Sequence, residues 1–344
     1  MKKIKVGLIG FGLSGRFFHS PLMLAHGGYE VLALSTSRHE EAKSIFSNAK
    51  IASPEQILND IEIELIINCA PNTFHYSYSA EALRNGKHVV VEKPFVNSVE
   101  EGEKLISLSE ISGKTLTVFH NRRWDSDFLT IKKLLSENVF GEIKQFESHF
   151  DRWRPSQRNE RWREQSLEGS GILFDLGSHL IDQALILFGK PQSVMADIEV
   201  QKPGGQSDDY FHIVFKYEKM RVILHSSSFS NFTPRFQIFG DKKSYIKYGL
   251  DPQEEQMKQG LSPQAPNFGV EEASARGQLH DPIANRVDTI PSEKGSYLQF
   301  YSDLYDHIAL KKNTLPVTSL DALEVIRLIQ IVKRCSELKT SLTV

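Results

Sequence analysis

A glycine-rich turn near the start of the chain carries the first residues that could bind a ligand. Residues 10–15 read Gly-Phe-Gly-Leu-Ser-Gly, directly after an aliphatic run at 4–9 and directly before an expected helix. In such a unit the first glycine permits the tight turn, the second lets the backbone approach a pyrophosphate, and the third allows close helix packing. The helix N-terminus adds N–H groups and the positive end of its dipole. This context favours a dinucleotide site over a turn without a ligand. The residues predicted to bind the cofactor here are Gly10, Phe11, Gly12, Leu13, Ser14 and Gly15.

The end of the second predicted strand indicates which dinucleotide is preferred. A site that reads the 2′-hydroxyl of NAD carries an acidic residue about 20 residues after the glycines. Here the chain instead reads Ser35, Thr36, Ser37 and Arg38. Hydroxyls and a guanidinium suit a 2′-phosphate. We therefore predict NADP, with NAD as a second possibility; the alternative is that Arg38 only occupies a surface loop.

A lysine and a histidine are the candidates for proton transfer. Lys93 lies in Glu92-Lys93-Pro94, directly after a predicted strand, where ligands of open α/β sheets bind; a solvated loop lysine is the alternative. Asp175 and His179 are four residues apart on a predicted helix and therefore share a face. An imidazole there can accept a hydroxyl proton while the carboxylate orients it. The alternative is a capping aspartate with a buried, hydrogen-bonded histidine.

Two different patterns of elements must position these residues. Up to about residue 121, short apolar runs alternate with helical stretches, which is typical of a doubly wound parallel sheet. From residue 122 onward, several predicted strands follow one another closely, with one long helix at 171–188, which favours an α+β domain with a mostly antiparallel open sheet. We expect domains at 1–121 and 122–344, with the C-terminal helices packing back on the first, and an irregular segment at 250–290.

Composition limits the classes of function. The 344 residues suit two domains, and 41 basic against 43 acidic residues leave a net charge of −2, which argues against nucleic acid and anionic membranes as partners. Two distant cysteines, Cys69 and Cys335, indicate neither a disulfide framework nor a metal site. No apolar run is long enough to span a bilayer. We expect a cytoplasmic protein that forms a homodimer or homotetramer through its open sheet.

Four motifs in chain order resemble those of the Gfo/Idh/MocA oxidoreductases. They are the glycine turn with Phe18-His19, Ala70-Pro71-Asn72 with His75, Gly86-Lys87-His88-Val89 with Glu92-Lys93-Pro94, and Gly171-x-x-x-Asp175-x-Gly177-x-His179. The resemblance covers residues 1 to about 190, and it is strongest to the NADP-preferring inositol or sugar dehydrogenase branch. It implies a Rossmann dinucleotide-binding domain followed by a substrate domain.

The resemblance also implies roles for individual residues. Lys93, Asp175 and His179 match the family's catalytic lysine, aspartate and histidine. Further cofactor-binding residues implied by position are Ala70, Pro71, Asn72, His75, Glu92, Lys93 and Asn121. Predicted substrate-binding residues are Lys93, Asp175 and His179, together with Arg123, Trp124 and Trp162, which are chosen only because they adjoin the motifs.

We therefore predict an NADP-dependent oxidoreductase that interconverts a secondary alcohol and a ketone on a polyol, inositol or sugar. Three alternatives remain open from the sequence: a nucleotide-binding regulator without catalysis, an enzyme that keeps its cofactor permanently bound, and a reductase of a non-sugar carbonyl or a tetrapyrrole. Arginines and tryptophans crowd residues 152–163, but interspersed acids favour a substrate rim or a subunit contact there over single-stranded nucleic acid.

Overall fold

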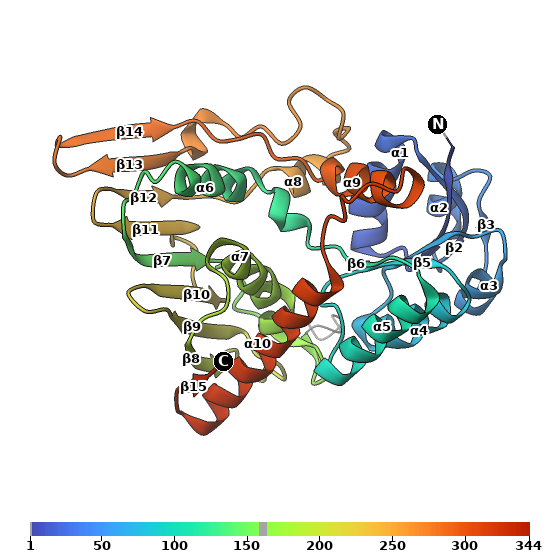
Figure 1. Cartoon of the computed structure of the whole chain (residues 1–344), viewed down its shortest axis with the longest axis horizontal. Helices are drawn as coiled ribbons and strands as arrows, with labels where there is room; N and C mark the ends of the chain where they lie inside the picture. Colours follow the sequence, from blue (N-terminus) through green and yellow to red (C-terminus); the bar gives the residue numbers. More distant parts are fainter. Residues whose placement is uncertain (1, 158–163) are drawn as a thin grey trace. The chain divides into compact units, whose positions relative to one another are not determined.

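The computed structural model describes residues 2–157 and 164–344 and divides into two compact units (Figure 1). Unit 1 comprises Met1–Trp124, Pro252–Gly269 and Ser296–Glu324, and unit 2 comprises Asp125–Asp251, Val270–Gly295 and Val325–Val344. The first break, after residue 124, is close to the predicted boundary at 121, and unit 1 also takes two later segments. Among the described residues, the helices are all too short or too polar to cross a bilayer.

Unit 1 is built on a six-stranded parallel sheet. Its strand order is β3-β2-β1-β4-β5-β6, with the reversal between β1 and β4. The strands are β1 (Ile4–Ile9), β2 (Tyr29–Ser35), β3 (Lys50–Ile51), β4 (Leu65–Asn68), β5 (His88–Val91) and β6 (Leu116–Val118). Strands β4, β5 and β6 are almost continuously apolar and buried, as a sheet covered on both faces requires. The predicted doubly wound sheet is confirmed.

Helices cover both faces of this sheet (Figure 1). They are α1 (Ser20–His26), α2 (His39–Ile45), α3 (Pro54–Asn59), α4 (His75–Arg84) and α5 (Val99–Ser112), while α8 (Gln253–Lys258) and α9 (Leu298–Ala309) pack on the segment 15–26 outside this layer. Helix α9 packs against α1, and the Tyr29 hydroxyl donates to the carbonyl oxygen of Tyr301 on α9 at 2.7 Å. A C-terminal segment therefore completes the core of the N-terminal unit.

Unit 2 contains a nine-stranded mixed sheet in the order β14-β13-β12-β11-β7-β10-β9-β8-β15. Strands β7 and β10 run parallel, and the other neighbouring pairs of this sheet run antiparallel. The strands are β7 (Ile143–His149), β8 (Ser193–Glu199), β9 (Tyr210–Lys216), β10 (Arg221–Ser227), β11 (Phe236–Gly240), β12 (Ser244–Lys247), β13 (Gly277–Asp281), β14 (Arg286–Ile290) and β15 (Leu342–Thr343). The predicted, mostly antiparallel sheet is confirmed.

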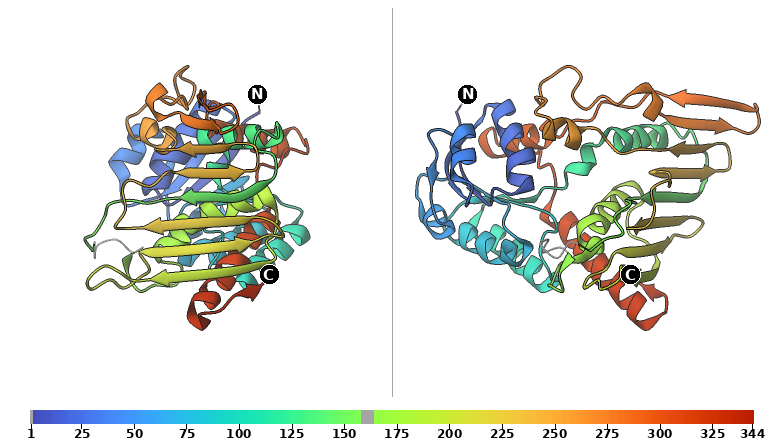
Figure 2. Two further views of the ribbon diagram at one scale, coloured as in Figure 1. Left: turned by 90° about the vertical axis from the view of Figure 1, so that its left-hand side faces the viewer. Right: turned by 180° about the vertical axis from the view of Figure 1, so that it is seen from behind.

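The described helices of unit 2 lie on one face of this sheet, and Figure 2 (left) shows the other face. They are α6 (Ser126–Ser136), α7 (Ser178–Phe188) and the later part of α10 (Ser319–Leu338), which crosses the unit boundary. Phe146 of β7 packs against Phe188 of α7, with ring centroids 5.1 Å apart. A buried Arg235 donates to Gln183 of α7 and to Ser148 of β7, which fixes this helix on the sheet.

One expectation about local structure was wrong in part, and one helix was not predicted. Residues 259–276 do consist of loops and turns, but the segment 250–290 also contains α8 and the β13–β14 hairpin that extends the sheet. Strand β14 is largely exposed and β13 buries a single apolar side chain, Leu279, so neither strand shows the regular alternation of apolar residues that predicts a strand. Helix α6 was also missed, although its buried residues Phe128, Ile131 and Leu134 recur at the three-residue spacing of a helix face.

Candidate active site

The glycine turn has the geometry that a pyrophosphate requires. Gly10 has φ +95°, and a Cβ there would lie 2.4 Å from the carbonyl oxygen of Cys69. A Cβ on Gly15 would lie 2.4 Å from the carbonyl oxygen of Gly10, so only glycine allows the helix to start this close. A Cβ on Gly12 would meet nothing within 4 Å. The middle glycine therefore borders open space, where a phosphate could approach the backbone.

The end of β2 lies directly beside this turn. The Gly10 N–H donates to the carbonyl oxygen of Ser35 at 3.1 Å. The Arg38 N–H donates to the Thr36 hydroxyl at 2.9 Å, which shapes the loop before α2. Ser37 and Arg38 are exposed. The hydroxyls and the guanidinium predicted to contact a 2′-phosphate are thus on one accessible loop next to the glycines.

The loop after β4 is organised by Asn68, a residue that the sequence analysis missed. Its buried side-chain amide donates to the carbonyl oxygens of Phe74 and His75 and to the Ser79 hydroxyl at 3.2–3.3 Å, and its Oδ1 accepts from the Ala70 N–H. The predicted cofactor loop Ala70–His75 is therefore held at its start and its end. The signal for Asn68 was an amide inside the otherwise apolar run Ile66-Ile67-Asn68.

Glu92 connects three parts of this edge. Its carboxylate accepts hydrogen bonds from Ser14 of the glycine turn, from His19 Nε2 at 2.9 Å, and from the Lys93 N–H at 3.0 Å. Burial by itself raises the pKa of Glu92, but these hydrogen bonds and the charges of His19 and Lys93 lower it to about 2. An ionised carboxylate thus fixes the main chain of Lys93 relative to the turn.

The position of Lys93 is set by buried neighbours. The Lys93–Pro94 peptide bond is cis, and the carbonyl oxygen of Pro94 lies 2.7 Å from Nδ1 of His75. The other ring nitrogen of His75 lies 3.1 Å from the carbonyl oxygen of Ala70. The buried His75 ring therefore joins the loop after β4 to the loop after β5. The Lys93 side chain is half-buried.

The remaining predicted residues of unit 1 have different surroundings. Asn121 is buried and begins the short helix Asn121–Trp124 after β6. Arg123 Nη1 pairs with Asp321 Oδ2 at 3.4 Å, and the Trp124 ring packs on Phe300. These contacts join the segment to the later pieces of unit 1, and substrate binding by Arg123 and Trp124 stays a prediction. Trp162 lies outside the described residues.

Asp175 and His179 lie where a π-helical turn meets an α-helix in unit 2. Residues Leu173–Gly177 form the π turn and α7 continues from Ser178, so the predicted helix 171–188 is present with a wider turn at Asp175. Such turns are found frequently at functional sites. Asp175 is half-buried and His179 is 5% exposed, with its ring centroid 6.4 Å from that of Phe150.

The start of this helix depends on Asp208, which the sequence analysis also missed. Asp208 Oδ2 accepts from the Leu173 N–H at 2.7 Å, and its carbonyl oxygen accepts from the Ile172 N–H at 3.0 Å. Gly171 has φ +86°, and a Cβ there would collide with the Asp208 carboxylate. This contact lets the chain enter the helix that carries Asp175 and His179.

Asp208 makes the stability of the protein depend on pH. Its burial raises its pKa from 3.8 to about 6, despite the hydrogen bond from Leu173. The native state therefore binds the Asp208 proton more tightly than the unfolded chain does. Protonated Asp208 adds to the free energy of unfolding below pH 3.8, and this addition is lost as the pH rises to about 6. Two pKa units correspond to about 3 kcal/mol. We expect D208N, which keeps an acceptor oxygen, to remove this slope in urea unfolding across that pH range. The same slope in both proteins would contradict the assignment.

Family models match most of the chain. The model described as the oxidoreductase family NAD-binding Rossmann fold matches residues 4–120, and the model for that family's C-terminal alpha/beta domain matches residues 132–344. The chain belongs to the Gfo/Idh/MocA oxidoreductase family. It is therefore an enzyme with an NAD(P)-binding domain, and the predicted family is confirmed.

Individual members of the Gfo/Idh/MocA family are similar over most of their length. The scyllo-inositol 2-dehydrogenase (NADP(+)) IolW of Bacillus subtilis is 40% identical over 98% of this chain and 95% of its own. The D-glucoside 3-dehydrogenase of Escherichia coli is 26% identical over 62% of this chain and 64% of its own. The solved structure of the oxidoreductase yvaA from Bacillus subtilis has a TM-score of 0.96 at 40% identity and covers 100% of this chain and 99% of that one.

Proposed function

We propose that this chain is an NADP-dependent dehydrogenase that interconverts a secondary alcohol of an inositol, sugar or related polyol with the ketone. The observation that carries the proposal is the edge of the unit 1 sheet, where Ser35–Arg38 adjoin the glycine turn and offer a cation and hydroxyls to a 2′-phosphate. The names of the inositol and glucoside dehydrogenases among the relatives support the substrate class.

The residues of unit 1 fit a dinucleotide. Gly12 leaves open space beside its backbone, and the N–H groups at the start of the following helix suit a pyrophosphate. The loops Ser35–Arg38 and Ala70–His75 would hold the ribose phosphate and the nicotinamide end. When bound, the nicotinamide supplies the exchange of a hydride with the carbinol carbon.

The proposed chemistry of the protein is to hold the alcohol oxygen and move its proton. Lys93 Nζ donates a hydrogen bond to that oxygen. An imidazole nitrogen of His179 accepts the hydroxyl proton during oxidation and returns it during reduction, and the Asp175 carboxylate orients this imidazole. Glu92 binds no substrate in this proposal but keeps the main chain of Lys93 in place. Positioning of this kind supplies a large share of the rate in hydride transfer.

The test of the proposal is a substrate panel followed by the absorbance of reduced nicotinamide. Untagged protein is mixed with scyllo-inositol, other inositols and a set of hexoses, with NADP and with NAD in parallel. We expect turnover with at least one inositol or sugar, and a higher kcat/KM with NADP. Binding of NADPH without turnover of any polyol or ketone, in either direction, would instead support a regulator.

Arg38 should decide the cofactor preference. Arg38→Ala removes one charge-assisted contact with a 2′-phosphate, which is worth about 1.5–3 kcal/mol. We therefore expect the KM for NADP to rise about 10- to 100-fold while the KM for NAD changes little. Arg84→Ala, at the exposed end of α4, is the matched control and should leave both values unchanged. An unchanged KM for NADP in Arg38→Ala would place the 2′-phosphate elsewhere.

A further inference from the structure

A row of three histidines crosses the uncovered face of the unit 2 sheet. His149 pairs in register with His225 on β10, and His225 pairs with His212 on β9. Phe146 and Ser148 of β7 point toward α7, so Glu147 and His149 point to the opposite face by the alternation of a strand. The row therefore lies away from the face that carries Asp175 and His179.

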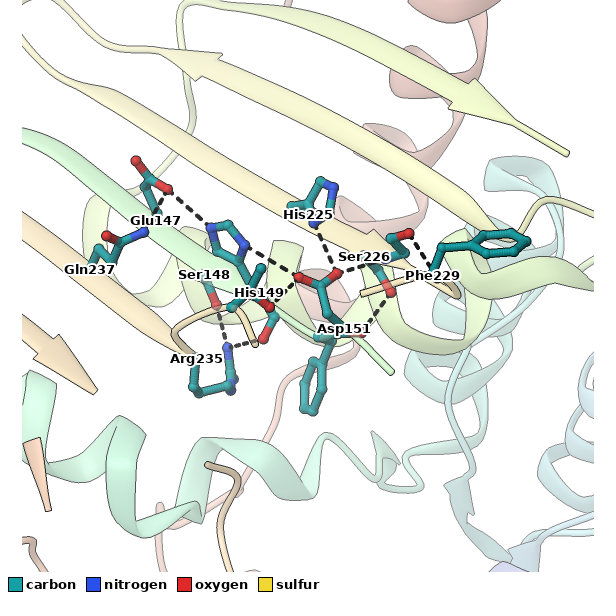
Figure 3. Close-up of polar contacts among 12 residues, drawn as sticks. Glu147, Ser148, His149, Asp151, His225, Ser226, Phe229, Arg235 and Gln237 are labelled. Atoms are coloured by element: carbon teal, nitrogen blue, oxygen red, sulfur yellow. Dashed lines mark hydrogen bonds and ion pairs between the residues drawn. The ribbon is translucent and has the colours of Figure 1, made fainter. Parts of the chain in front are cut away.

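Asp151 turns one end of this row into a cluster of convergent ligand atoms, which we call the histidine cluster: His149, Asp151 and His225 (Figure 3). His149 Nδ1 lies 3.6 Å from Asp151 Oδ2, and His225 Nδ1 lies 2.9 Å from Asp151 Oδ1. The three ligand atoms all lie within 4.8 Å of one another. Both Nδ1 atoms are buried, yet neither is aligned for a hydrogen bond. Two ring nitrogens thus lie close to one carboxylate, but their angles do not fit hydrogen bonds to it.

The outer contacts of His149 set which ring nitrogen has a lone pair. His149 Nε2 lies 3.0 Å from Glu147 Oε2, and the same oxygen accepts from the Gln237 side chain at 3.0 Å (Figure 3). Glu147 accepts hydrogen bonds at this oxygen, so the neutral ring carries its proton on Nε2 and points a lone pair from Nδ1 at Asp151. A carboxylate that orients a histidine in this way is the usual outer partner of a metal-binding imidazole.

The side chain of Asp151 is held in a fixed position. It is 2% exposed, Oδ1 accepts from the Ser227 N–H at 2.7 Å, and Oδ2 accepts from the Thr233 hydroxyl. These contacts preorganise the carboxylate before any cation arrives.

We propose that His149, Asp151 and His225 bind one divalent transition-metal ion of the Zn²⁺ class on the uncovered face of the sheet. Ligands at 2.0–2.1 Å around a tetrahedral ion are separated by about 3.3 Å, and the observed 3.6 and 2.9 Å separations lie on either side of that value. Two imidazoles and one carboxylate suit Zn²⁺ or Co²⁺, whereas Ca²⁺ and Mg²⁺ prefer oxygen ligands alone. Water would complete the coordination, and the ion would tie β7, β10 and the segment after β7 together.

The test uses untagged, chelator-treated full-length protein, titrated near neutral pH with Co²⁺ and followed by the visible absorption of tetrahedral cobalt, and then with Zn²⁺ by calorimetry. We expect one ion per chain and a rise in melting temperature on adding Zn²⁺, with no rise for Mg²⁺. His149→Asn and His225→Asn should each weaken Zn²⁺ binding about 100-fold, and Glu147→Gln should weaken it about 10-fold.

His212→Asn is the matched control, because this histidine stands in the same row but outside the histidine cluster. Its affinity for Zn²⁺ should stay within about twofold of wild type. Glu147→Gln keeps the test decisive if a ligand variant does not fold, because it leaves all three ligands in place. Two results would overturn the proposal: wild-type protein that binds no Zn²⁺ at one ion per chain, or a folded His149→Asn,His225→Asn variant that binds it as tightly as wild type.

Discussion

Replacing Lys93 with alanine is expected to lower kcat by about 10³- to 10⁴-fold while the Kd for NADPH stays within about twofold. The proposed function gives the Lys93 ammonium the task of holding the alcohol oxygen. The truncation removes this group but keeps the hydrogen bond from the Lys93 N–H to Glu92, because that bond belongs to the main chain. The glycine turn and the loop after β4 have their own anchors, so the cofactor site should persist. Steady-state kinetics and quenching of NADPH fluorescence measure the two effects.

Lys104→Ala is the matched control for Lys93→Ala, because Lys104 lies on the exposed side of α5 and should affect neither quantity. Near-native kcat in Lys93→Ala would remove the lysine from the reaction. Loss of NADPH binding together with kcat would show that Lys93 acts through the cofactor site instead of through the substrate. Only a large fall in kcat at constant Kd agrees with the proposed role.

The N-terminal unit could be predicted well because its signals are local. The glycine spacing, the apolar strands and the helices between them are each contained in fewer than 20 consecutive residues, and parallel pairing follows from their alternation. The motif residues Glu92 and Lys93 follow β5 directly, so their edge of the sheet could be predicted too. These expectations required no knowledge of distant contacts.

The partners of the motif residues could not be predicted, because they come from distant parts of the chain. His19 Nε2 bonds to Glu92, and His19 Nδ1 lies 2.5 Å from the hydroxyl oxygen of Tyr301, which is 282 residues away in the chain. Asp208 caps a helix that begins 35 residues earlier than itself. A single sequence contains no local pattern that joins such pairs, although a buried polar residue signals that some partner exists.

The histidine cluster illustrates the same limit on the sheet. The alternation at Glu147, His149 and Asp151 places three polar side chains on one face, which a strand pattern can predict. The register that brings His225 beside His149, 76 residues away in the chain, arises from the parallel pairing of β7 with β10 in an otherwise antiparallel sheet. The two cysteines gave no indication of this site, and an imidazole–carboxylate set has no fixed spacing in the sequence when its members lie on different strands.

Gly12→Val is expected to weaken NADPH binding by about 100-fold, or about 3 kcal/mol, without lowering the melting temperature. The Cβ position of Gly12 meets nothing within 4 Å, and its backbone does not require positive φ, so the protein itself has room for the side chain. The added methyl groups would occupy the space where the pyrophosphate approaches the turn. Fluorescence titration with NADPH and thermal unfolding measure the two quantities on the same protein.

Gly10→Ala separates a steric effect on the ligand from damage to the turn. Gly10 has φ +95°, and a Cβ there would lie 2.4 Å from the Cys69 carbonyl oxygen, so this variant should lose both stability and NADPH binding. The contrast between the two glycines depends only on what each Cβ would meet: protein for Gly10 and open space for Gly12. If Gly12→Val binds NADPH as tightly as wild type, the open space beside Gly12 is not where the pyrophosphate binds. If Gly12→Val unfolds as readily as Gly10→Ala, the turn does not tolerate a side chain at Gly12. Weak NADPH binding by Gly12→Val would then report damage to the turn and not a clash with the pyrophosphate.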